Sequence, residues 1–102
     1  MNIIPPHDHF DASHLEWIKS KMLVLGVPFI KAVWVEAYNA WVALEGCHRI
    51  HAAKALGLVP IIEPIEYDED LTTDDVVPGS YDDTWSVARI CDDAYNIEPL
   101  VF

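Results

Sequence analysis

Four consecutive residues, Gly46, Cys47, His48 and Arg49, combine the groups that a phosphate site requires. They follow an apolar, strand-like stretch and open a segment with helical periodicity. A helix start exposes unpaired N–H groups and the positive end of the helix dipole, so it attracts anions. Glycine lets a ligand approach the backbone, and guanidinium and imidazole groups add charge-assisted hydrogen bonds to phosphate. A thiol at such a helix start is also a candidate nucleophile. We therefore predict phosphate binding by all four residues (the 46–49 turn), with Cys47 and His48 as candidate catalytic residues.

The same turn also has a purely structural interpretation. The side chain of Cys47 would then be buried in the core, and Arg49 would pair with an acid such as Glu45. Residue types and spacing alone leave both interpretations open.

The surrounding sequence resembles the ParB/sulfiredoxin superfamily. Sulfiredoxins carry Gly-Gly-Cys-His-Arg at this turn, and residues 28–35 are similar, without a gap, to their Pro-Pro-Ile-x-Val-Leu-Trp-Ile strand. Residues 52–57 (Ala-Ala-Lys-Ala-Leu-Gly) match the alanines and the Leu-Gly pair that ParB-type domains carry downstream of their turn. The likeness spans roughly residues 12–66.

The resemblance implies an α+β fold in which helices pack against a small mixed β-sheet. It also implies ATP or another nucleotide, accompanied by magnesium, or another phosphorylated small molecule at the 46–49 turn. If the protein is an enzyme, the implied reaction class is nucleotide-dependent phosphoryl transfer, as in sulfiredoxins and free-serine kinases. A ParB-like nuclease is a further alternative on the same fold.

Two acidic residues distinguish this chain from sulfiredoxins. Glu45 stands where they have a second glycine, and Glu36 stands where they carry a lysine that helps to hold ATP phosphates. Both changes argue against reduction of a sulfinic acid. Free-serine kinases carry acid-Gly-His-His-Arg at the turn, and Glu45-Gly46-x-His48-Arg49 is similar to this motif. Small-molecule kinase chemistry therefore stays open as an alternative.

Composition predicts a single folded domain, residues 1–102. The chain is 52% apolar and has four tryptophans, which we expect in the core, and it has no apolar run of the ~20 residues that cross a membrane. The first residues lack the basic start and long apolar stretch of a secretory signal, so we expect a cytoplasmic protein without membrane contact. Two cysteines so far apart do not form a disulfide framework.

The negative charge lies in the C-terminal third. Residues 1–62 hold five acidic and five basic residues, whereas residues 63–102 hold twelve acidic residues against Arg89 alone, a net charge of −11. Such a surface repels duplex DNA, so direct DNA binding is not expected and a nuclease fits poorly. The charge has two interpretations: it maintains solubility, or it forms an acidic face for a basic partner, as in a DNA-mimicking protein. We expect residues 67–102 to form an acidic extension that packs on the domain.

Periodicity and turn residues predict the elements of the first two thirds. Ser13 and Glu16 form a capping-box pattern, which places a helix start at or near Ser13, and Gly26 ends that helix. Pro60 and Pro64 favour an edge position for the last strand. The predicted elements are a strand at 2–4, a helix at 13–26, strands at 29–35 and 40–44 around a turn at 37–39, a helix at 47–57 and an extended segment at 58–65.

The acidic third predicts fewer elements. We expect an acidic loop at 67–75, a turn at 77–80, and a last helix that Asp82 and Asp83 cap and that runs to about Tyr95. From Asn96 onward the chain is expected to be irregular. The apolar stripe of the last helix is predicted to consist of Trp85, Ala88 and Cys91.

Three other groups were weighed as sites. The pattern His7-Asp8-His9, with His14 nearby, offers imidazole and carboxylate ligands, but no further ligands follow at a recognisable spacing, and we predict no metal site. His51 is interpreted as a solvated helix residue. The acidic run at 68–75 lacks the glycine and spacing of an EF-hand and is interpreted as a solvated loop.

Overall fold

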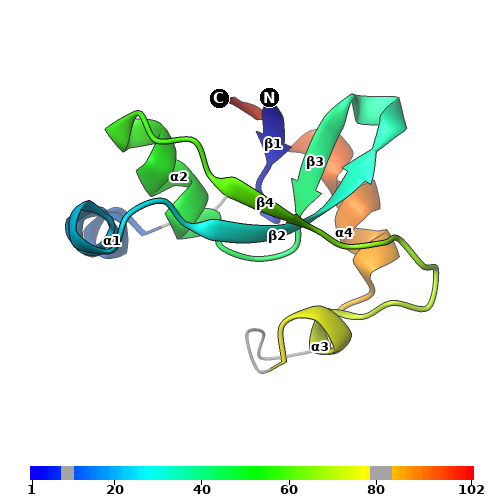
Figure 1. Ribbon diagram of the computed structural model, residues 1–102. Helices are drawn as coiled ribbons and strands as arrows, with labels where there is room; N and C mark the ends of the chain where they lie inside the picture. The colour runs from blue at the N-terminus through cyan, green and yellow to red at the C-terminus, as the bar shows by residue number, and fades with distance from the viewer. Residues whose placement is uncertain (8–10, 79–83) are drawn as a thin grey trace.

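The computed structural model describes residues 1–7, 11–78 and 84–102 of the chain. It confirms an α+β fold, in which helices pack on both faces of a mixed sheet (Figure 1). Along the described residues the elements are β1 (Asn2–Ile4), α1 (Ala12–Leu25), β2 (Phe29–Val35), a 3-10 turn (Glu36–Tyr38), β3 (Ala40–Ala43), α2 (Cys47–Leu56), β4 (Ile61–Pro64), α3 (Thr73–Val76), α4 (Val87–Asp93), a second 3-10 turn (Ala94–Asn96) and β5 (Leu100–Val101).

The strands of the described residues form one sheet in the order β4-β2-β3-β1-β5. β2 and β3 form the predicted antiparallel hairpin, in which Val33 pairs with Val42, and Asn39 closes its turn with a φ of 49°. β4 runs parallel to β2, and β1 runs parallel to β3. β4 lies at the edge, as predicted, where the missing N–H group of Pro64 costs no hydrogen bond to a neighbouring strand.

One face of the sheet is covered by α2. Ile3, Ile30 and Ile50 are fully buried there and hold the helix against the strands. α1 packs in turn on α2, where Met22 contacts Ala52 and Ala53, whose small side chains let the two helices approach closely. This pair of helices fixes the start of α2, where the predicted site lies.

The opposite face is covered by residues of the acidic third. Val33 and Leu44 of the sheet side pack in one buried cluster with Val87 and Ile90 of α4 and with Val76 of α3. Burying a valine such as Val87 completely contributes about 1.5–3 kcal/mol, so this face is a true core and not a loose contact. The C-terminal third therefore shares a core with the sheet (Figure 1).

The cap of α1 differs from the prediction. The helix begins at Ala12, close to the expected boundary, but its N-cap is Asp11, whose carboxylate accepts the backbone N–H of His14 at 3.0 Å. Asp11 and Ser13 are both good capping residues, and the extended backbone of Asp11 decides between them. Gly26 ends the helix as predicted.

The end of the chain also differs. α4 begins at Val87, after Ser86, so Trp85 precedes the helix, and the buried stripe consists of Val87, Ile90 and Ala94. The proposed caps Asp82 and Asp83 lie outside the described residues, as do two residues of the turn predicted at 77–80. The end of the chain is not irregular, because β5 pairs antiparallel with β1. The predicted acidic loop contains the short helix α3.

The tryptophans are less buried than expected. Trp17, Trp34 and Trp85 are exposed, and Trp41 is partly buried and packs edge-on against Trp34. Within the described ranges, every helix is too short or too polar to cross a membrane.

Candidate functional site

The 46–49 turn is built around a glycine with a left-handed backbone. Gly46 is the N-cap of α2 and has a φ of 74°, a conformation that other residues rarely adopt. A Cβ atom at this position would lie 2.8 Å from Cδ1 of Ile30 and 3.0 Å from a terminal nitrogen of Arg49. Both the backbone angle and the space therefore require glycine, which turns the chain sharply from β3 into α2.

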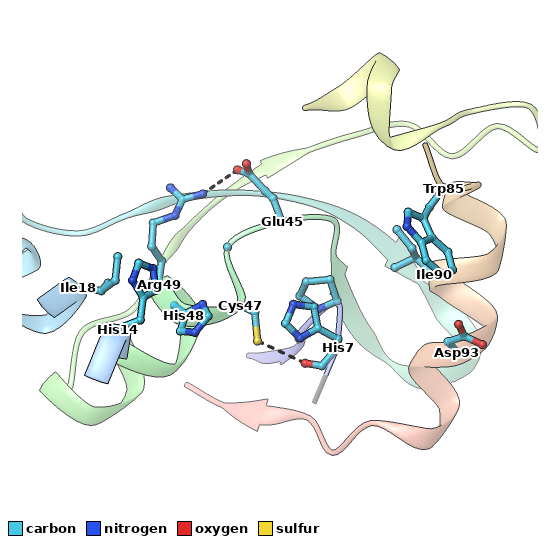
Figure 2. Close-up of a pocket in the computed structure, with 12 residues that line it drawn as sticks. His7, His14, Ile18, Glu45, Cys47, His48, Arg49, Trp85, Ile90 and Asp93 are labelled. Atoms are coloured by element: carbon cyan, nitrogen blue, oxygen red, sulfur yellow. Dashed lines mark hydrogen bonds and ion pairs between the residues drawn. The ribbon is translucent and has the colours of Figure 1, made fainter. Parts of the chain in front are cut away.

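A pocket of about 700 Å³ opens at this turn. Figure 2 shows the start of α2 on one side of the pocket and α4 on the other, with His7 between them. The lining residues come from four segments and are Pro6, His7, His14, Ile18, Glu45, Gly46, Cys47, His48, Arg49, Trp85, Ile90 and Asp93. All four residues predicted from the sequence thus line one pocket.

Cys47 lies on the inner side of the turn. It is 4% exposed, and its Sγ donates to the backbone carbonyl of His7 at 3.4 Å (Figure 2). In this hydrogen bond the sulfur carries its proton, so the thiol must lose it before it could act as a nucleophile.

His48 is held from two sides. Its Nε2 accepts the backbone N–H of Asp11 at 3.0 Å, which places the proton of a neutral ring on Nδ1. The ring of His14 lies edge-on at 4.5 Å between centroids. The hydrogen bond from the backbone N–H of His14 is the main cause that lowers the pKa of Asp11. The cap of α1 thereby positions His48 at the pocket.

Arg49 is engaged within the protein. One terminal nitrogen lies 3.1 Å from Oε1 of Glu45, and the other donates to the carbonyl of Phe29 at 3.1 Å. The side chain of Arg49 is 36% exposed and that of Glu45 is 17% exposed. The purely structural interpretation of the turn predicts a buried Cys47 and an ion pair between Arg49 and Glu45, and both features are present. The same three residues also line the pocket.

The opposite wall of the pocket was not predicted. It consists of Trp85, Ile90 and Asp93, from the acidic third. The sequence contains no motif there, and Trp85 was assigned to the core stripe of a longer helix. The only signal was a large aromatic residue that falls between an acidic stretch and a helix.

The other candidate groups are histidines and carboxylates outside the turn. Among the described residues, no group of three histidine, cysteine or acidic side chains could hold a metal ion. His7 lines the pocket, while Asp8 and His9 lie outside the described residues. His51 is half-buried rather than solvated, and burial is the main cause that lowers its pKa. The acidic residues 68–70 are exposed and do not line the pocket.

Comparison of the chain with protein-family models, with curated proteins and with solved structures gives no match.

Proposed function

We propose that the protein binds a phosphorylated ligand, in the first place a nucleotide, at the 46–49 turn. The observation that carries the proposal is that the N-terminus of α2, with glycine as its N-cap, opens into a pocket also lined by His7, His14 and His48. The helix dipole and first-turn N–H groups favour an anion there, and imidazoles are donors to phosphate when protonated. The volume of about 700 Å³ lies within the range of small-molecule sites.

Arg49 and Glu45 set the strength of this site. A phosphate that reaches Arg49 shares the guanidinium with the Glu45 carboxylate 3.1 Å away. Glu45 also repels the phosphate directly, because it lines the same pocket. We therefore propose a moderate affinity, because phosphate and carboxylate compete for the same guanidinium. The affinity should fall with added salt, because salt screens the attraction between phosphate and this partly exposed cation.

The reaction that we assign to this site is phosphoryl transfer from a nucleotide, in line with the ParB/sulfiredoxin resemblance. Within the pocket His48 is the candidate acid or base and Cys47 the candidate nucleophile. His48 would have to release the Asp11 N–H before its Nε2 could accept a proton. Magnesium usually binds phosphates together with one or two carboxylates, and Glu45 is the carboxylate that lines the pocket at the turn itself.

Thermal unfolding with and without nucleotide tests the proposal. Millimolar ATP, ADP or CTP with Mg²⁺ should raise the melting temperature, because a ligand that binds only the folded state stabilises it by mass action. Arg49→Ala should abolish this increase. Because Arg49 also holds Phe29 and Glu45, the increase is measured against each variant's own unliganded value. Lys19→Ala, which removes a cation of α1 paired with Glu16, is the matched control and should keep the full increase.

Two results would contradict the proposal. One is the absence of any nucleotide-dependent increase in the unaltered chain. The other is an equal increase in the Arg49→Ala variant.

A second candidate function follows from the exposed carboxylates of the acidic third. Asp68, Glu69, Asp70 and Asp74 are all exposed, and Arg89 is the single basic residue after position 62. We propose as the alternative that this surface binds a basic protein, in place of the DNA that such a partner would otherwise bind.

Neutralising four carboxylates tests this alternative. Asp68→Asn, Glu69→Gln, Asp70→Asn and Asp74→Asn remove charge and keep shape, whereas Asp75 is retained because its carboxylate accepts both the N–H and the hydroxyl of Thr72. Binding of basic DNA-binding proteins, measured at several salt concentrations with duplex DNA as competitor, should weaken strongly. Glu16→Gln is the control in the neutral region. Unchanged binding by the four-site variant would exclude this surface.

A further inference from the structure

The pocket is larger than a phosphate group and its two walls differ in chemistry. Its volume of about 700 Å³ is typical of sites for whole organic ligands, which bury most of their surface. The wall at α2 carries imidazoles, a guanidinium and a helix start, whereas the wall at α4 presents an indole, an aliphatic side chain and a carboxylate (Figure 2). The second wall is suited to a part of the ligand that is flat, apolar and bears a hydrogen-bond donor.

Trp85 is fixed in position by its backbone. Its N–H donates to the hydroxyl of Thr73 at 3.0 Å, and its carbonyl accepts the N–H of Thr73 at 2.8 Å. Thr73 is itself only 1% exposed, so this connection is anchored in the core. The guanidinium of Arg89 lies 4.8 Å from the centre of the indole ring and holds the side chain. The ring is therefore preorganised at the pocket while 38% of the residue stays accessible to a ligand.

Asp93 retains acceptor capacity at the same wall. Its side chain is 62% exposed, and its Oδ2 lies 3.9 Å from Nε of Arg89, a distance at the limit of an ion pair. Such a surface pair is weak, so it does not compete strongly with a ligand donor. Asp93 is the last residue of α4, whereas Trp85 precedes the first turn of this helix, and both residues line the same pocket.

We propose that Trp85 and Asp93 bind the base of a nucleotide whose phosphates lie at the 46–49 turn. The base packs on the indole ring and on Ile90, and its exocyclic amino group donates to the Asp93 carboxylate. The ligand class is thus a nucleoside phosphate with an amino-bearing base, such as adenine or cytosine. This inference rests on the proposed function, because it takes phosphate binding at α2 as its starting point.

Matched pairs of nucleotides test the inference on the unaltered chain. In inosine triphosphate (ITP) a carbonyl oxygen replaces the amino group of ATP, and UTP differs from CTP in the same way. A carboxylate accepts a hydrogen bond from the amino group and repels the carbonyl oxygen. Calorimetric titration with Mg²⁺ should therefore show ATP binding at least ~5-fold more tightly than ITP, and CTP more tightly than UTP.

Two variants with matched controls separate the roles. Asp93→Asn should bring the ATP and ITP affinities together, whereas Asp92→Asn, on the same helix and outside the pocket lining, should preserve the difference. Trp85→Ala should weaken ATP and ITP binding alike by roughly 10-fold, because both bases lose the aromatic side chain on which they stack. Its anchoring hydrogen bonds are made by backbone atoms and survive the substitution. Trp34→Ala is the control for losing an exposed indole.

Inorganic tripolyphosphate distinguishes failure of this inference from failure of the proposed function. If tripolyphosphate binds as tightly as ATP, the α4 wall does not recognise a base and only the phosphate site remains. If ATP and ITP bind equally, Asp93 does not accept a hydrogen bond from the amino group, and the inferred recognition of an amino-bearing base is wrong. If neither ATP nor tripolyphosphate binds, both proposals are wrong. The inference is supported if ATP binds more tightly than tripolyphosphate and than ITP, if Trp85→Ala reduces the advantage over tripolyphosphate, and if Asp93→Asn removes the advantage over ITP.

Discussion

The two walls of the pocket come from regions of opposite character. The wall at α2 belongs to residues 1–62, which carry no net charge; its turn is set within a few residues of Gly46, and the cap of α1 positions His48 beside it. The wall at α4 belongs to the acidic third, and it reaches the pocket only because Val87 and Ile90 pack on the far face of the sheet. A local motif thus supplies one half of the site, and long-range packing supplies the other.

The two walls of the pocket should respond differently to amino-acid substitutions. The α2 wall depends on a left-handed backbone angle that only glycine adopts readily and on an ion pair between residues four apart. The α4 wall depends on side-chain burial and on a backbone connection to Thr73. Substitutions at the first should therefore act mainly through the turn itself, and substitutions at the second through the shared core.

The largest effect is expected from adding a methyl group at the turn. Gly46→Ala should lower the free energy of unfolding by about 2–4 kcal/mol, because left-handed strain adds to a clash with Ile30. Gly57→Ala is the matched control, since Gly57 has a φ of 71° but open space around its Cα, and it should cost only about 1–2 kcal/mol. Urea unfolding of both variants measures the difference. Equal losses would show that the turn is not sterically constrained.

The two regions each contain one cysteine, Cys47 and Cys91, whose rates of alkylation should differ. Burial is the main cause that raises the pKa of Cys91 to about 11, with Asp92 adding to it. Little thiolate exists at this position near pH 8, so iodoacetamide should react slowly there. If Cys47 is the nucleophile, it should react at least ~10-fold faster than Cys91 at pH 8. Mass spectrometry of peptides at timed intervals measures both rates, and equally slow reaction would make Cys47 a packing residue.

The smallest effect concerns the cap that connects α1 with His48. The pKa of Asp11 is lowered in the folded protein, so its contribution to stability is present above the unfolded pKa and is lost as the pH falls through the folded value. Asp11→Asn keeps an oxygen that can accept the His14 N–H but removes the charge. Thermal unfolding should show a small destabilisation at pH 7 that disappears at the acid end, below both pKa values. A constant difference at every pH would assign the effect to shape and not to charge.

The sequence by itself determined the elements whose causes are local. β2 begins and ends at the predicted residues, and α2 begins at the predicted Cys47 and is capped at its end by Gly57. The edge position of β4 agrees with Pro60 just before it and Pro64 within it. The motif also brought its four residues to one pocket, because neighbours in the chain at a helix start share a surface.

Tertiary structure decided the rest. β5 forms because Leu100 pairs with Ile3, which lies near the other end of the sequence. A strand of two residues without strong strand signals cannot be predicted from the local sequence. Asp11, rather than Ser13, caps α1 because its backbone is extended at that point. Trp85 and Asp93 complete the pocket because α4 buries Val87 and Ile90 against the sheet. Which face of α4 is buried depends on the apolar surface that the rest of the fold leaves exposed on the sheet.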